Sequence, residues 1–136
     1  MSRALASKIK AANSALITHD NLDAVGEFFT PDYAVHLTDQ RMALGHDGIR
    51  RILRMYRRAF ANLQLEVEIL VTAKDRVAWL RTFRAIHKGD FKGFPATGRP
   101  VVWRDMVTSR FRDGLIAEDW SITDLAERLL LARKKR

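Results

Sequence analysis

Long alternating segments fill most of the second half of the chain. Apolar and polar residues alternate over 63–73, 77–91, 101–111 and 115–123. Short turn signals separate these segments, except for the Gly- and Pro-containing loop at 92–100. Alternation with a period of two, bounded by turn residues, is typical of half-buried strands. The pattern predicts a meander of long antiparallel strands.

Helical periodicity dominates the part of the chain that precedes this meander. Apolar residues at helical spacing predict helices, and one short segment predicts a strand. The helices are expected at 2–17, 21–29, 46–62 and 124–135, and the short strand at 32–37. Helices followed by a run of strands indicate an α+β domain in which helices pack on one face of a curved sheet. Such a sheet leaves a pocket beneath it, and pockets of this kind bind small ligands.

Length and residue usage limit the chemistry that the chain can perform. With 136 residues it is expected to form one domain, 1–136, with one core. Cysteine is absent, which excludes disulfides, thiolate nucleophiles and Cys-ligated metals. The sequence contains neither a signal-peptide pattern nor an apolar run of membrane-spanning length, so we expect a cytoplasmic protein with no membrane partner.

The positive charge of the chain has two interpretations. The formal net charge is +8, and Arg50, Arg54, Arg57 and Arg58 recur at helical spacing opposite an apolar stripe. A basic helix face and the basic tail at 132–136 could contact nucleic acid. We favour a solvated outer helix face and a solubilising tail, because a charged face opposite an apolar stripe is the normal anatomy of a surface helix.

Asp119 occupies a strand position that alternation would bury. If a three-residue turn places Phe111 opposite Leu115, then Asp119 lies opposite Val107 and shares a face with Asp105. If Asp113-Gly114 instead forms a two-residue turn, Asp119 pairs with Thr108 and Asp105 moves to the other face. In the first register the two acids would lie close together, so that one would have a raised pKa and could act as a general acid or base. The alternative is that both acids form ion pairs with nearby arginines.

Several other side chains are candidates for the walls of the pocket. The imidazole of His36 could orient a carbonyl, and His87 could bind ligand or order the adjacent loop. Aromatic side chains could line a cavity for a flat ring system or simply form the core, and a tyrosine could donate a phenolic proton. The aromatic candidates are Trp103, Trp79, Phe83, Tyr33 and Tyr56. The four histidines lack metal-binding spacing, so no metal site is expected.

The region 87–124 carries a family resemblance. It contains His87-Lys88-Gly89, then a loop Gly93-Phe94-Pro95-Ala96-Thr97-Gly98, then Phe111-Arg112-Asp113-Gly114-Leu115-Ile116 and Glu118-Asp119-Trp120. This order of motifs resembles the SnoaL-like polyketide cyclases and predicted ester cyclases of the nuclear transport factor 2-like superfamily. The upstream segments "FFTPDYAVH" and "GHDGIRRILRMYRRAFANLQLEVE" are similar to the same family.

The resemblance implies a cone-shaped α+β fold, an antiparallel-rich curved sheet wrapped around the N-terminal helices, which usually dimerises through the outer face of the sheet. It also implies acid/base chemistry at a carbonyl without metal or cofactor, with Asp119 as the acid/base and His36 in the pocket. The position of Asp105 resembles one that holds a pocket His in the cyclases, so an Asp there is a departure from the family pattern.

We therefore expect a cofactor-independent, homodimeric enzyme of the polyketide or ester cyclase type that acts on a small hydrophobic or aromatic carbonyl compound. Other reactions in the same cavity remain alternatives, because the fold alone does not select the chemistry: isomerisation, dehydration, hydroxylation or epoxide hydrolysis. A non-catalytic ligand-binding or interaction domain is the rival from a different functional class, and a nucleic-acid binder is a weaker one.

Overall fold

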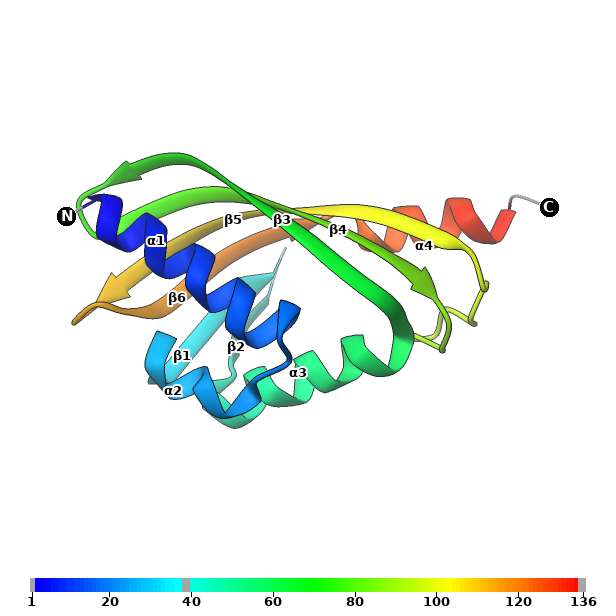
Figure 1. Ribbon diagram of the computed structural model, residues 1–136, viewed down its shortest axis with the longest axis horizontal. Helices are drawn as coiled ribbons and strands as arrows, with labels where there is room; N and C mark the ends of the chain where they lie inside the picture. The colour runs from blue at the N-terminus through cyan, green and yellow to red at the C-terminus, as the bar shows by residue number, and fades with distance from the viewer. Residues whose placement is uncertain (1, 38–39, 135–136) are drawn as a thin grey trace.

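One curved sheet of six strands arches over helices from the first part of the chain (Figure 1). A computed structural model describes residues 2–37 and 40–134. The strands stand in the order β2-β1-β6-β5-β4-β3, antiparallel except for the parallel pair of β1 and β6. Their bounds are β1 Phe29–Leu37, β2 Gln40–Ala43, β3 Phe60–Ala73, β4 Arg76–His87, β5 Pro100–Arg112 and β6 Leu115–Thr123.

The helices precede the long strands, apart from one that follows β6. Their bounds are α1 Ser2–Asn13, the π-helix η1 Ser14–Thr18, the short 3-10 helix η2 Leu22–Ala24, α2 Val25–Phe28, α3 Gly45–Ala59 and α4 Leu125–Lys134. Figure 1 shows α1 and α3 on the side toward which the sheet curves. This arrangement confirms the predicted α+β class with a curved sheet wrapped around N-terminal helices.

The core lies between the curved sheet and these helices. Every second residue of β5 from Val101 to Phe111 is buried, as the alternation predicts. Trp103 and Phe83 face each other across β5 and β4 with their rings stacked 4.7 Å apart, and both are fully buried. Aromatic pairs at this separation add to the free energy gained from burying their surface.

The β5–β6 hairpin has neither of the two predicted registers in full. Asp113 and Gly114 both have positive φ angles, 54° and 77°, and form the two-residue turn that joins Arg112 to Leu115. A β-bulge follows, because Phe111 pairs with Ile116 but Arg110 pairs with Glu118, which leaves Ala117 as the extra residue.

The bulge adds one residue to β6. The side chains after it therefore point to the opposite face from the one that the two-residue turn alone would give. Asp119 pairs with Ser109, so it points to the same side as Ser109 and Asp105. The structure therefore has the two-residue turn of one alternative together with the face of Asp119 that the other alternative predicted.

Two local features were not expected from the sequence. Strand β2 has only four residues, mostly exposed, and pairs along the edge of the sheet with β1, so it carries no alternating pattern. The helix predicted over 2–17 changes from α to π geometry at Ser14. The Arg57 side chain donates a hydrogen bond to the carbonyl of Ile17 in this π segment.

Within residues 2–37 and 40–134, none of the helices has the length and apolar character needed to span a membrane.

Candidate active site

A cavity of about 310 Å³ lies between the sheet and the helices. Its walls come from α1 and η1 on one side, from α3 on another, and from the inward-facing residues of β1, β4, β5 and β6. Most of these side chains are apolar, among them Leu16, Leu53 and Val107. A mostly apolar cavity with a few polar groups is the usual form of a small-molecule site.

Asp119 is one of the few carboxylates on the cavity wall, and it is 8% exposed. The hydroxyl of Tyr33 donates a hydrogen bond of 2.6 Å to its Oδ2. The hydroxyl of Ser109 donates a hydrogen bond of 2.5 Å to its Oδ1, and Trp79 Nε1 donates to Ser109 Oγ at 3.0 Å. Each oxygen of the acid is therefore fixed by a neutral hydroxyl donor.

Burial raises the pKa of Asp119 above its ordinary value of 3.8. The hydrogen bonds from Ser109 and Tyr33, and the charge of Arg81, act in the opposite direction but do not cancel this effect. The pKa of Tyr33 is raised far above 10 by burial and by the neighbouring Asp119, so this phenol remains protonated. Its burial, neutral donors and raised pKa make Asp119 a candidate for a general acid or base.

Asp105 also lines the cavity, but it is held by a cation. Arg81 Nε and Nη2 donate to Asp105 Oδ2 at 3.1 and 2.7 Å, and Arg81 Nη1 donates to Asn13 Oδ1 at 2.8 Å. The guanidinium also lies 5.1 Å from the ring centre of Trp79 and 4.9 Å from that of Phe83. These contacts fix Arg81 in one position and leave Asp105 as half of a buried ion pair.

The two acids share a face but do not form the closely coupled pair that we predicted. Asp119 stands opposite Ser109, whereas Asp105 stands opposite Thr123, four residues further along β5. At about 3.3 Å per strand residue the two positions lie roughly 13 Å apart. The close pair, which was expected only with the three-residue turn, is therefore not formed, because the two-residue turn and the bulge at Ala117 together set a register that separates the acids. The alternative expectation was that each acid forms an ion pair with an arginine. It holds for Asp105 but not for Asp119.

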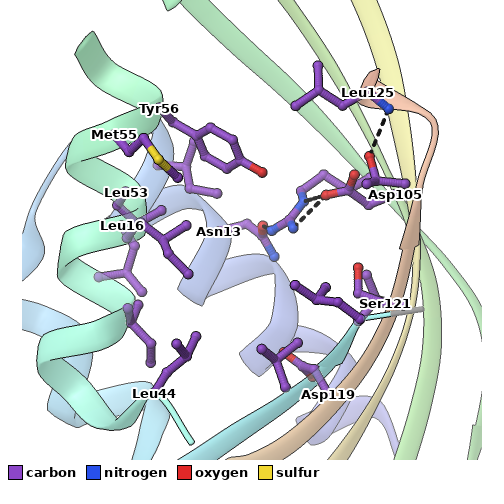
Figure 2. Close-up of a pocket in the computed structure, with 18 of the residues that line it drawn as sticks. Asn13, Leu16, Leu44, Leu53, Met55, Tyr56, Asp105, Asp119, Ser121 and Leu125 are labelled. Atoms are coloured by element: carbon purple, nitrogen blue, oxygen red, sulfur yellow. Dashed lines mark hydrogen bonds and ion pairs between the residues drawn. The ribbon is translucent and has the colours of Figure 1, made fainter. Parts of the chain in front are cut away.

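Tyr33, Tyr56 and Trp79 line the cavity, where the sequence placed them as pocket candidates. The ring of Tyr56 stacks on Phe91 at 5.5 Å, and Figure 2 shows its hydroxyl projecting from α3 toward Asp105. Phe91 and Phe94 exchange two backbone hydrogen bonds around the turn Lys92-Gly93, so the loop after β4 forms a tight turn beside the cavity.

His36 lies on the opposite face of the sheet from the cavity. Because β1 alternates, Tyr33 and Val35 point inward and His36 points outward. Its ring stacks on Trp120 with the ring centres 4.7 Å apart, and its Nε2 is hydrogen-bonded to Glu118. Glu118 also accepts a hydrogen bond from Arg110. Our placement of His36 in the pocket is therefore corrected by the geometry.

Three further candidates are buried outside the cavity wall. Trp103 and Phe83 belong to the aromatic core described above, which is the alternative interpretation given for them. His87 is fully buried at the end of β4, and burial lowers its pKa. Its backbone accepts a hydrogen bond from Gly98 and donates one to Arg99, so His87 orders the loop that follows.

Arg81 and Asn13 are cavity residues that the sequence patterns did not indicate. Arg81 lies between Trp79 and Phe83 on one face of β4, so strand alternation was the signal that could have found it. Asn13 lies four residues after Ile9 on the buried face of α1 and donates to the Ile9 carbonyl. Among the described residues, no group of three or more His, Asp or Glu side chains converges in a way that could hold a metal ion.

A family model matches most of this chain. The model describes SnoaL-like polyketide cyclases, and it matches residues 8–130. The chain belongs to the SnoaL-like polyketide cyclase family. This membership accounts for the curved sheet and the cavity of this SnoaL-like protein. A search of curated protein sequences gives no significant match.

Solved structures of related proteins share the fold of this SnoaL-like chain. AclR, a proposed hydroxylase from Streptomyces galilaeus, is 26% identical with a TM-score of 0.83, over 100% of this chain and 89% of that one. IdmH, a proposed polyketide cyclase from Streptomyces antibioticus, is 26% identical with a TM-score of 0.78, over 95% and 97%. A proposed polyketide cyclase from Acidithiobacillus ferrooxidans is 21% identical with a TM-score of 0.85, over 100% and 99%.

Proposed function

We propose that this SnoaL-like protein is a cofactor-independent enzyme that uses Asp119 as a general acid/base at a carbonyl compound. The observation that carries this proposal is the buried Asp119 carboxyl on an apolar cavity wall, held by Ser109 and Tyr33. Its raised pKa lies nearer to neutral pH than the pKa of an exposed Asp, and this favours proton transfer in both directions.

The proposed reaction starts with removal of a proton from the carbon next to a substrate carbonyl. The Asp119 carboxylate takes this proton, and the electron pair of the C–H bond forms an enolate. In a cyclase the enolate carbon then attacks a second carbonyl of the same molecule, and the resulting alkoxide regains the proton from Asp119. The apolar walls exclude water and so strengthen the electrostatic interactions that hold the anion.

The test uses proton exchange, which needs no knowledge of the natural substrate. Aromatic methyl ketones are incubated with the protein in deuterium oxide, and exchange of the protons next to the carbonyl is followed by NMR. We expect catalysed exchange in the wild type and a loss of about a hundredfold or more in Asp119→Asn. Asp113→Asn in the exposed turn is the matched control and should exchange at the wild-type rate. Ketone binding without exchange would contradict the proposal and favour a ligand-binding domain.

Hydroxylation in the same cavity is a second candidate, favoured by the 26% identity to the proposed hydroxylase AclR across the whole of this chain. Mass spectrometry of the ketones after incubation in air distinguishes the two, because only hydroxylation adds an oxygen atom.

We further propose that two copies associate through the outer face of the sheet. Met106 and Ile122 are cross-strand partners on that face and are 56% and 69% exposed. Leu80 pairs with Met106 on the other side, so an apolar row crosses three strands. Exposed apolar rows of this kind mark protein–protein contacts.

A further inference from the structure

A second polar position lies on the cavity wall, away from Asp119. The Asp105 side chain is 4% exposed, and both hydrogen bonds from Arg81 go to its Oδ2. Its Oδ1 is buried and has no hydrogen-bond partner among the described residues. An acceptor of this kind, removed from water and left unpaired, costs free energy until a donor reaches it.

Tyr56 supplies the complementary group. Its hydroxyl projects from α3 toward Asp105 across the cavity (Figure 2). Burial, and then the charge of Asp105, raise the pKa of Tyr56 to about 12, so the phenol is a donor at neutral pH. The wall therefore presents an acceptor on the sheet and a donor on the facing helix.

Only some ligand groups satisfy both residues at once. A hydroxyl donates one hydrogen bond and accepts another, whereas an ether or a ketone cannot donate and an ammonium cannot accept. Arg81 already neutralises the charge of Asp105, so the site offers no net negative charge to hold a cation. The site is thus suited to a neutral hydroxyl group.

We propose that Asp105 and Tyr56 bind a hydroxyl group of the ligand, at the end remote from the carbon that Asp119 would deprotonate. This inference rests on the proposed function, since it assigns Asp119 to the reacting end. The separation of roughly 13 Å along the sheet between the two acids accommodates two fused aromatic rings with substituents at opposite ends. The substrate class is an elongated aromatic ketone that carries a distal phenolic or alcoholic hydroxyl.

Three probe compounds test this assignment: an acetonaphthone with a hydroxyl on the ring remote from the acetyl group, its methyl ether, and the unsubstituted ketone. Binding to the full chain is measured by calorimetry at neutral pH. We expect the hydroxyl compound to bind about tenfold or more tightly than the other two, as for a hydrogen bond to a charged acceptor. Equal affinities, or no binding by any of the three, would overturn the assignment.

Two variants test which residues cause the preference for the hydroxyl compound. Tyr56→Phe removes only the phenolic oxygen, and the preference for the hydroxyl compound should fall several-fold. In Asp105→Asn the amide oxygen must face Arg81, so the cavity receives an NH₂ donor and the preference should nearly vanish. Asp47→Asn on the exposed start of α3 is the matched control and should keep the full preference. If Asp105→Asn does not fold, Tyr56→Phe decides, and an unchanged preference in Tyr56→Phe would contradict the proposal.

The same compounds separate this inference from the proposed function. Proton exchange next to the carbonyl reports Asp119, and the affinity difference reports the distal hydroxyl site. Exchange without any hydroxyl preference would overturn the distal site alone. A hydroxyl preference without exchange would overturn the proposed acid/base function and leave the distal site standing.

Discussion

At the scale of the residue, Asp119 differs from the other buried acid in the kind of partner that holds it. Ser109 and Tyr33 contribute neutral donors to Asp119, while Arg81 contributes a full charge to Asp105. Neutral donors do not fully offset the loss of water around a buried carboxylate, so Asp119 gains its charge at a cost in folding free energy. Such a cost is typical of groups kept for chemistry rather than for stability.

This cost predicts a pH-dependent effect of Asp119→Asn on stability. Because the folded-state pKa is raised, the contribution of Asp119 is fully present below about pH 3.8, the ordinary value, and is lost as the pH rises through the raised pKa. The asparagine variant has no such loss. We therefore expect the melting temperature of the variant, relative to wild type, to increase from pH 4 to pH 8. A relative melting temperature that falls over this range would indicate a lowered pKa and a structural acid.

At the scale of the element, the arginines of α3 do more than cover a solvated face. Arg57 donates to the Ile17 carbonyl and lies 3.6 Å from Asp20, and Arg50 Nε donates to the Leu22 carbonyl at 3.2 Å. Both carbonyls belong to the helical segments that precede β1. These arginines therefore tie α3 to η1 and η2, and η1 carries cavity residues.

Removing one of these anchors should affect both stability and the cavity. In Arg57→Met the Ile17 carbonyl loses its side-chain donor, which we expect to lower the free energy of unfolding by about 1 to 2 kcal/mol. Urea unfolding measures this change, and ketone affinity should weaken in parallel. Arg54→Met, at an exposed position of the same helix, is the control. Equal effects of the two substitutions would show that the Arg57 contact contributes nothing specific.

Some elements of the fold depend only on their own sequence and can be predicted from it. Strand β6 was predicted at 115–123 and is found there, because alternation and turn residues lie within the segment itself. The face of Asp119 depends on the bulge at Ala117, and this bulge depends on pairing with β5 and β1. The partner of Asp105 depends on which β4 residue lies opposite it, and the register with β4 assigns Arg81. Pairing between strands was therefore the information that sequence patterns lacked.

At the scale of the whole molecule, the two faces of the sheet have different uses. The concave face of the sheet covers the helices (Figure 1), whereas the outer face carries the apolar row of Leu80, Met106 and Ile122, of which Met106 and Ile122 are exposed. Burying such a row against a second copy would gain free energy in proportion to the apolar area removed from water.

The outer face predicts the oligomeric state. We expect sedimentation experiments to find a dimer for the wild type and a monomer for Met106→Glu, because the substitution would place a charge in the centre of the contact. Leu131→Glu makes the same chemical change at an exposed position of α4 and should remain dimeric. A monomeric wild type, or a dimeric Met106→Glu protein, would argue against this contact.

The parallel pairing of β1 with β6 also has a consequence for the order of folding. The Tyr33–Asp119 hydrogen bond joins residues 86 positions apart. During synthesis, β1 leaves the ribosome long before its partner exists, so this neighbour of the acid stays incomplete until β6 has emerged. Contacts between such distant parts of a chain slow folding, because a long loop must close before they form. The proposed acid/base centre is therefore expected to be among the last parts of the molecule to assemble, and a nascent chain that ends before β6 cannot contain it.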